Sequence, residues 1–306
     1  MKILILILQL LLFITLAPFL SGLITKIKNY LRMRKGQSVL QPYYNLAKLF
    51  SKSEVVSETA SWIFKVTPFV VFSSALAASL LIPLFIFADS LYQMGDFLAL
   101  IFIFTLGRFF LALSALDTGG SFGGMGSSRE MFISSLVEPV ICLIVFSLFL
   151  QFGSTNILAF SGLHAISVSS IVAAAALFFV AIAETSRVPV DNQETHLELT
   201  MVHEAMLLEY SGRSLAFLEM ASYIKQMIWF FLIAQIIFPI SLFGFFSLAQ
   251  AGLWLLWYLT RIFIIAIAVA LVEVTVAKMR LFRVADFLGF AFVLGVVAAV
   301  CAILGV

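Results

Sequence analysis

The hydrophobic residues of this sequence gather into long, nearly uninterrupted stretches. A helix needs about 20 apolar residues to cross the hydrocarbon core of a bilayer. Eight stretches meet this requirement, at residues 3–25, 66–88, 96–116, 131–152, 165–184, 214–246, 252–277 and 286–306. Ten-residue segments of alternating hydrophobicity, which would indicate an outer-membrane barrel, do not occur. The pattern therefore predicts an all-α fold, a polytopic bundle of about eight transmembrane helices in which residues 1–306 form a single integral membrane domain.

One short segment has an amphipathic pattern instead. Apolar residues recur there with the spacing of one helical face, at Tyr43, Leu46, Ala47 and Phe50. Lys48 and Lys52 lie where they can reach lipid headgroups. We expect a short interfacial helix, which either covers the surface or helps a partner to dock.

Composition narrows the class of protein. Of the 306 residues 63% are hydrophobic and only 11% are charged, with a net charge of +2. This composition excludes a soluble enzyme and a disordered chain, because both need more polar surface. It also excludes a nucleic-acid binder, which needs a strongly positive surface to attract a polyanion. The two cysteines, Cys142 and Cys301, lie far apart in apolar stretches. An iron–sulfur cluster needs about four thiolates, so any redox cofactor must belong to a partner.

Basic residues lie in alternate loops and orient the bundle. The loops near 89–95, 153–164 and 247–251 carry no Lys or Arg. The other loops are basic, and basic loops stay in the cytoplasm. Their residues are Lys26, Lys28, Arg32, Arg34, Lys35, Lys48, Lys52, Lys65, Arg129, Arg187, Arg213, Lys278, Arg280 and Arg283. This distribution predicts a multi-pass protein of the cytoplasmic (inner) membrane, with both termini outside and residues 185–213 in the cytoplasm.

The segment 119–128 is rich in glycine and serine. A phosphate-binding loop is excluded because no Gly-Lys-Ser/Thr sequence follows. We expect a flexible turn between packed helices.

The segment 184–213 is acidic where the positive-inside rule expects a basic loop. If residues 191–209 are helical, Asp191, Glu194, Glu198 and Glu209 fall within an arc of about 60°. Carboxylates this close share protons, so the stripe suits proton transfer. The candidates for proton relay and coupling are Glu138, Glu184, Asp191, Glu194, Glu198, Glu204 and Glu209. The candidates for docking or ion pairing are Arg129, Glu130, Arg187 and Arg213.

A zinc site in this segment is disfavoured. His203-Glu204 begins an H-E-x-x-H pattern, but Leu207 occupies the second histidine position. His196 and His203 are about two helical turns apart, which is too far for one ion on a rigid helix. We predict no metal, no cofactor and no catalytic residue in this chain.

Six charged residues lie inside predicted spans: Arg108, Glu138, Glu219, Lys225, Arg261 and Glu273. Charges at membrane depth are costly and usually face the bundle interior or a water-filled cavity. Arg108 and Lys225 are candidates for snorkelling to the headgroups. Glu138 precedes Pro139, which frees a backbone carbonyl and makes room for water. Glu138 is therefore either a proton relay or a structural ion-pair partner.

These motifs resemble a known family. Glu184-x-x-Arg187-x-Pro189-x-Asp191-x-x-Glu194 and Glu209-Tyr210-Ser211-Gly212 are similar to the signature of the quinone-site membrane subunit of NADH-quinone oxidoreductase, respiratory complex I. Ser128-Arg129-Glu130, Glu138-Pro139 and Leu116-Asp117-Thr118-Gly119 resemble its hydrogenase branch, which contains formate hydrogenlyase subunit 4 and hydrogenase-4 component C. The resemblance covers nearly the whole chain.

Three features depart from the complex I pattern. His196 replaces an acidic residue, the stretch from Leu199 to Glu209 is about three residues longer, and Lys35-Gly36-Gln37 stands where Arg-x-Gly-Pro is common. These changes fall where complex I admits and binds quinone.

The resemblance implies a subunit that anchors a cytoplasmic nickel–iron and iron–sulfur module. Its expected partners are the hydrogenase small and large subunits, an iron–sulfur subunit, antiporter-like membrane subunits and the lipid membrane, but no nucleic acid. The nickel–iron centre and the clusters would lie in those partners, and redox chemistry would drive translocation of H⁺ or Na⁺. The quinone-site subunit of NADH-quinone oxidoreductase is one alternative, and a stand-alone secondary transporter is another.

Overall fold

The computed structural model describes residues 2–83, 95–161, 167–192, 201–238 and 248–305, and these residues are almost entirely helical. The helices are α1 (Lys2–Leu31), α2 (Gln41–Ser51), α3 (Trp62–Leu80), α5 (Phe97–Asp117), α6 (Ser121–Phe152), α7 (Val168–Glu184), α8 (His203–Leu207), α9 (Gly212–Ile237), α10 (Leu248–Thr275) and α11 (Leu281–Leu304), with a 3₁₀ turn at Ile157–Ser161. The predicted helical membrane bundle is confirmed.

Within the described residues, seven helices are long and apolar enough to cross a membrane: α1, α3, α5, α6, α9, α10 and α11. The eighth expected span corresponds to α7, an apolar helix of 17 residues. At a rise of 1.5 Å per residue it is about 25 Å long, slightly less than the hydrocarbon thickness. The last residues of the spans expected at 66–88 and 214–246 lie outside the described part of the chain.

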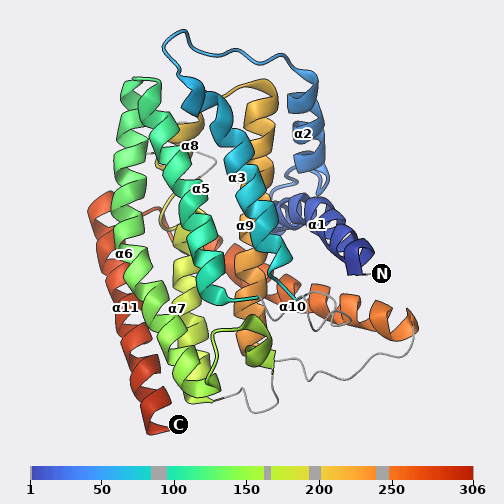
Figure 1. The fold of residues 1–306 in the computed structure, drawn as a ribbon, viewed down its shortest axis with the longest axis vertical. Helices are drawn as coiled ribbons and strands as arrows, with labels where there is room; N and C mark the ends of the chain where they lie inside the picture. Colours follow the sequence, from blue (N-terminus) through green and yellow to red (C-terminus); the bar gives the residue numbers. More distant parts are fainter. Residues whose placement is uncertain (1, 84–94, 162–166, 193–200, 239–247, 306) are drawn as a thin grey trace.

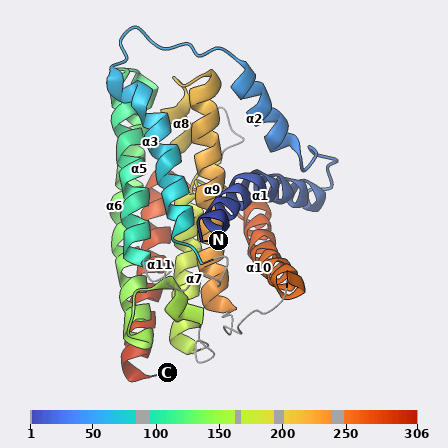
Figure 2. The ribbon, with the colours of Figure 1, turned by 45° about the vertical axis from the view of Figure 1, so that its right-hand side comes forward.

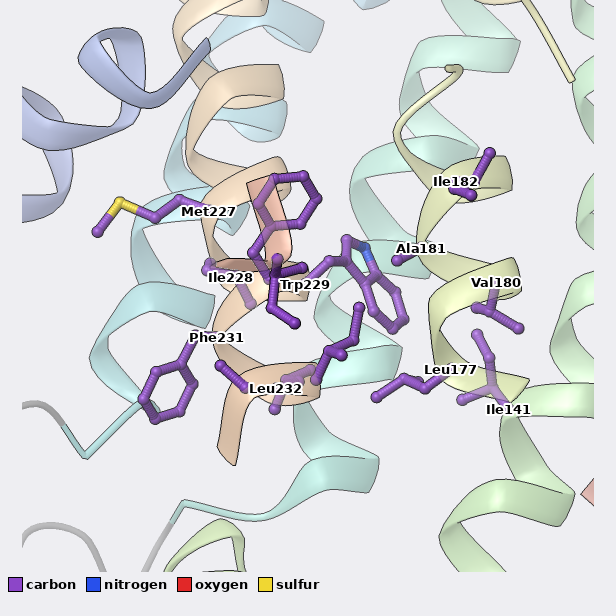
Figure 3. Packing of buried hydrophobic residues seen from close by; sticks show 14 of the residues in the cluster. Ile141, Leu177, Val180, Ala181, Ile182, Met227, Ile228, Trp229, Phe231 and Leu232 are labelled. Carbon is purple, nitrogen blue, oxygen red and sulfur yellow. The ribbon is translucent and has the colours of Figure 1, made fainter. Parts of the chain in front are cut away.

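Most of the long helices run alongside one another, whereas α1 and α10 are strongly inclined to them (Figures 1 and 2). Helix α9 is central and packs against α1, α2, α3, α7 and α10. It is buried without a break from Gln226 to Ile236, as expected of a helix that is apolar all round. Figure 3 shows the Trp229 ring of α9 turned toward Ala181 of α7. The core thus forms around α9.

The segment expected to form an interfacial helix is α2. Pro42 lies in its first turn, where a missing N–H costs nothing. Leu46 is buried while Tyr44 and Phe50 are exposed, so the helix shows apolar side chains outward as well as inward.

The turn expected at residues 119–128 is wrong for most of that segment, because α6 begins at Ser121. The glycines serve close packing. A Cβ on Gly126 would lie 2.8 Å from Ala205 Cβ and 3.0 Å from the carbonyl oxygen of Val202, so only glycine lets α6 approach α8 this closely. Glycine composition alone cannot distinguish a flexible turn from a tight helix contact.

Candidate functional site: a buried line of charges

A cavity lies among α1, α3, α5, α6, α7, α8 and α9, and its empty volume, which includes the open solvent at its mouth, is about 800 Å³. We call it the central cavity. Its charged and titratable lining residues are Arg108, Glu130, Glu184, His203, Tyr223 and Lys225. Among the sequence candidates, Glu130 and Glu184 are therefore brought to one site.

Glu184 is the central anion of this site. It ends α7, its side chain is 3% exposed, and it receives two cations. Arg108 of α5 donates to one carboxylate oxygen, and Lys225 Nζ of α9 lies 2.7 Å from the other. Two cations compensate the cost of burying the carboxylate, so Glu184 is held in one position.

Arg108 extends the line toward the outer surface of the bundle. Its guanidinium also donates to Ser134 of α6, and Ser134 Oγ donates to Glu138 Oε1 at 3.2 Å. The Arg108 Nη1 to Glu138 Oε1 distance is 3.7 Å. The Glu138 side chain is 46% exposed in this chain, near the middle of α6. The line Lys225–Glu184–Arg108–Glu138 thus runs from the central cavity to a carboxylate at the edge of the bundle.

Snorkelling is therefore the wrong interpretation for Arg108, which is buried and paired. Lys225 also turns inward, to Glu184. The sequence placed both residues inside spans but could not show that their partner lies at the end of another helix.

A second group of buried charges surrounds Glu273 of α10. Arg187 Nη1 lies 2.6 Å from Glu273 Oε1, and Lys28 Nζ lies 3.2 Å from Glu273 Oε2. Arg187 Nη2 donates to Gln226 Oε1 at 2.9 Å. Arg187 is 6% exposed, so the structure pairs this docking candidate inside its own chain. Lys28 and Gln226 are members of the group that sequence reasoning missed.

Asp191 is a structural carboxylate. It is 1% exposed and lies 2.8 Å from Lys278 Nζ. Its Oδ2 accepts hydrogen bonds from the backbone N–H groups of Val202 at 3.0 Å and His203 at 3.3 Å. These contacts join the two ends of the stretch 193–200, which lies outside the described residues.

The carboxylate stripe was conditional on one helix over 191–209, and the described residues do not form such a helix. Residues 191–192 and 201–202 are not helical, and α8 covers only His203–Leu207. Asp191 and Glu209 therefore do not lie on one continuous helix. Glu194, Glu198 and His196 lie outside the described residues.

The remaining candidates lie near one end of the bundle, where α8 and the first residues of α6 and α9 meet (Figure 1). Arg129 donates to the carbonyl oxygen of Met201 at 2.9 Å. Glu204 is partly buried on α8, while Glu209 and Arg213 are exposed.

Among the described residues, no group of three or more His, Cys, Asp or Glu side chains could hold a metal ion.

The motif Glu209-Tyr210-Ser211-Gly212 fixes the start of α9. The Tyr210 ring stacks on Phe64 at 4.0 Å, and its hydroxyl donates to the Phe64 carbonyl oxygen at 3.2 Å. That carbonyl lacks its usual helical donor because Pro68, four residues on, has no N–H. Burial raises the pKa of Tyr210 to about 12, so the hydroxyl keeps its proton at physiological pH.

The next two residues of the motif hold the connection between α2 and α3. Ser211 Oγ donates to the carbonyl oxygen of Val55 at 3.0 Å and accepts from its N–H at 2.9 Å. Gly212 has φ +52°, and a Cβ there would lie 2.6 Å from the carbonyl oxygen of Ser53. The motif is therefore structural.

Comparison with known proteins agrees with this architecture. The NADH dehydrogenase family model matches residues 2–304. The chain belongs to this family. It is 32% identical over 289 residues to hydrogenase-4 component C of Escherichia coli (strain K12). The aligned region covers 92% of this chain and 91% of the relative. It is 30% identical over 278 residues to formate hydrogenlyase subunit 4 of the same strain, covering 89% and 90%.

More distant family members extend the comparison. The NADH-ubiquinone oxidoreductase chain 1 of Murina suilla is 26% identical over 215 residues, covering 67% of this chain and 66% of that one. A chain of the membrane-bound sulfane sulfur reductase, an archaeal respiratory membrane complex, has the same fold. The two structures superpose with a TM-score of 0.80, and their sequences are 18% identical. The superposition covers 97% of this chain and 99% of that chain. The resemblance to the hydrogenase branch is confirmed.

Proposed function

We infer that this chain is the membrane-anchor and coupling subunit of a complex I-like membrane-bound hydrogenase. It docks a cytoplasmic nickel–iron and iron–sulfur module and links its redox chemistry to H⁺ or Na⁺ translocation by antiporter-like subunits. The electron-transfer cofactors belong to the docked subunits. The similarity to hydrogenase-4 component C and formate hydrogenlyase subunit 4 supports the class of complex.

One observation carries the coupling role. The ion-pair line from Glu184 through Arg108 ends at Glu138, whose carboxylate is half exposed at membrane depth. A carboxylate facing acyl chains is costly, so a neighbouring membrane subunit covers it in the complex. Because neighbouring charges in the line are in contact, a change of charge at the central cavity changes the electrostatic field at Glu138. The line thus transmits an event at the docked module to the next membrane subunit.

The docking surface is the end of the bundle that contains α8 and residues 117–121. Glu209 and Arg213 are exposed there, and Arg129 and Glu130 lie on the adjoining turn of α6. We assign this end and the loop 185–213 to the cytoplasm, because the basic loops converge on it. Arg129, Glu130, Arg187 and Arg213 serve docking, and Glu138, Glu184, Asp191, Glu194, Glu198, Glu204 and Glu209 serve coupling. Arg187 and Asp191 act indirectly, by shaping the segment beneath the module.

Glu138→Gln tests the coupling role. Glutamine keeps the shape of the side chain but cannot exchange a proton. We expect normal assembly and normal H₂ production from reduced methyl viologen, with ion pumping in inside-out vesicles reduced several-fold. Ser135→Ala, on an exposed position of the same helix, is the matched control. Unchanged pumping stoichiometry in Glu138→Gln would refute the relay.

A quinone-linked role is the second candidate, since NADH-ubiquinone oxidoreductase chain 1 is a relative and the chain has a central cavity. The identity is higher, and extends over more of the chain, for the hydrogenase relatives. Reduction of a short-chain quinone by the purified complex distinguishes the two. A stand-alone transporter would purify without hydrogenase subunits.

A further inference from the structure

An apolar cleft lies between α1 and α10, the two inclined helices of the bundle (Figure 2). Its empty volume, which includes the open space at its mouth, is about 750 Å³. Met227 of α9 is buried and closes the cleft on the bundle side, whereas Phe19, Leu256 and Phe263 are exposed. The cleft therefore opens away from the bundle, toward the membrane. It is lined by Leu16, Phe19, Leu20, Leu23, Met227, Leu256, Leu259, Thr260, Ile262 and Phe263.

The walls of the cleft suit a flexible chain better than another helix. Transmembrane helices pack closely through small residues such as Gly, Ala and Ser, and the lining contains none of these. Its side chains are bulky and apolar except for Thr260. From Leu16 to Leu23 the cleft follows about 10 Å of α1, at a rise of 1.5 Å per residue. An acyl chain can fill an irregular apolar space of this length.

A cluster of cations lies beyond one end of the cleft. Lys26 is seven residues after Phe19, so the two side chains leave α1 within about 20° of each other. Lys26 Nζ donates to the carbonyl oxygen of Lys35 at 3.2 Å, and the N–H of Arg34 donates to the carbonyl oxygen of Asn29 at 2.9 Å. These bonds fold the chain back after α1 and keep three exposed cations together. We call Lys26, Arg34 and Lys35 the basic turn.

The charges of the basic turn are not balanced within the described part of the chain. No Asp or Glu precedes Glu54 in the sequence. The ion pairs between described residues include Lys28, which binds Glu273, but none of the three cations of the basic turn. A positive cluster beside the membrane attracts the phosphates of anionic lipids.

We propose that the cleft and the basic turn together bind one anionic phospholipid. An acyl chain lies between α1 and α10, and the phosphate lies at Lys26, Arg34 and Lys35. The lipid fills the space that the side chains leave and holds α1 against α10, next to the ion pair of Lys28 with Glu273. The cytoplasmic leaflet supplies this lipid, an assignment that rests on the proposed orientation. The site itself does not depend on the proposed coupling function.

Photo-crosslinking of the assembled complex tests the lipid site. The complex is reconstituted into phosphatidylcholine vesicles that contain a small fraction of phosphatidylglycerol with a diazirine in one acyl chain. A parallel sample contains phosphatidylcholine with the same diazirine. After irradiation, mass spectrometry maps the labelled peptides. We expect phosphatidylglycerol to label residues 16–23 and 256–263 several-fold more than phosphatidylcholine does, with equal labelling elsewhere on the complex.

Removing the charges of the basic turn tests the headgroup. The triple variant Lys26→Gln, Arg34→Gln, Lys35→Gln leaves the lining of the cleft unchanged. We expect its labelling by phosphatidylglycerol to fall to the level of phosphatidylcholine. The matched control removes three exposed lysines outside the basic turn and should keep the preference: Lys48→Gln, Lys52→Gln, Lys65→Gln.

Filling the cleft tests the acyl chain. Thr260 is an exposed lining residue, so Thr260→Trp places an indole in the cleft without disturbing the core. Labelling of residues 16–23 by either lipid should fall several-fold. Ile264→Trp is the matched control, because Ile264 is exposed on α10 and does not line the cleft. If Thr260→Trp does not assemble, the triple variant decides alone.

Equal labelling by the two lipids would overturn the site, as would full labelling by phosphatidylglycerol in the triple variant of the basic turn. A helix of another subunit or a quinone in the cleft would protect residues 16–23 and 256–263 from both lipids, and this result also rejects the proposal. None of these measurements involves Glu138, so a failure of the lipid site is distinct from a failure of the coupling role.

Discussion

Lys225 and Gln226 are adjacent on α9, yet their side chains join two different groups of buried charges. Lys225 Nζ lies 2.7 Å from Glu184 Oε2, and Gln226 Oε1 accepts from Arg187 at 2.9 Å. Successive helical residues point about 100° apart, so one turn of α9 contacts the charges at the end of α7 and those beside α10. A rotation of α9 would disturb both groups together.

Arg187→Ala should destabilise the protein and loosen the docked module. The change removes one of the two cations beside Glu273 and the donor to Gln226. Loss of one partner of a buried ion pair costs about 3 kcal/mol. We expect a lower unfolding temperature in detergent and less hydrogenase activity retained in washed membranes.

The double variant Arg187→Ala, Glu273→Gln should be less destabilised than the sum of the single variants, since no carboxylate is left underpaired. Arg283→Ala, at an exposed arginine, is the surface control and should change stability by less than about 0.5 kcal/mol. A fully attached, fully active module in Arg187→Ala would argue against its contribution to docking.

Tyr210→Phe should cost about 1–3 kcal/mol, because the carbonyl of Phe64 loses its donor while it remains buried. Pro68→Ala restores an N–H four residues after Phe64. The effect of Tyr210→Phe should therefore shrink in the Pro68→Ala background. Thermal unfolding of the four proteins gives the coupling between the two positions. Additive effects would mean that Tyr210 contributes only through its ring.

Gly126→Ala should separate α8 from α6. The added methyl meets the backbone of Val202 and Met206 as well as Ala205, and backbone atoms cannot move aside cheaply. We expect destabilisation of about 1–3 kcal/mol and weaker attachment of the module. Gly124→Ala is the matched control, because its nearest neighbour would be Leu116 Cδ2 at an ordinary 3.8 Å. Equal stability of the two variants would contradict the packing role.

The orientation of the bundle can be tested with single cysteines in a background without native cysteines. Thr195→Cys should resist a membrane-impermeant maleimide in intact cells and react after permeabilisation. Ser154→Cys, in a loop on the opposite side, should react in intact cells. Labelling of position 195 without permeabilisation would reverse the orientation.

The sequence was sufficient for features that depend on local pattern. The long apolar stretches predicted the spans, and helical spacing predicted α2. It was insufficient where the deciding contact is distant along the chain. Asp191 and Lys278 are 87 positions apart, and Arg108 and Glu184 are 76 apart. The local pattern makes Arg108 a candidate for snorkelling and permits a helix over 191–209, because neither pattern contains the distant partner.

The closure at Asp191 has an evolutionary consequence. Its carboxylate accepts hydrogen bonds from the backbone N–H groups of Val202 and His203, so these two positions are held beside Asp191. The same contacts can form with a longer or shorter segment between them, so this part of the sequence can change in length during evolution while α7 and α8 keep their places.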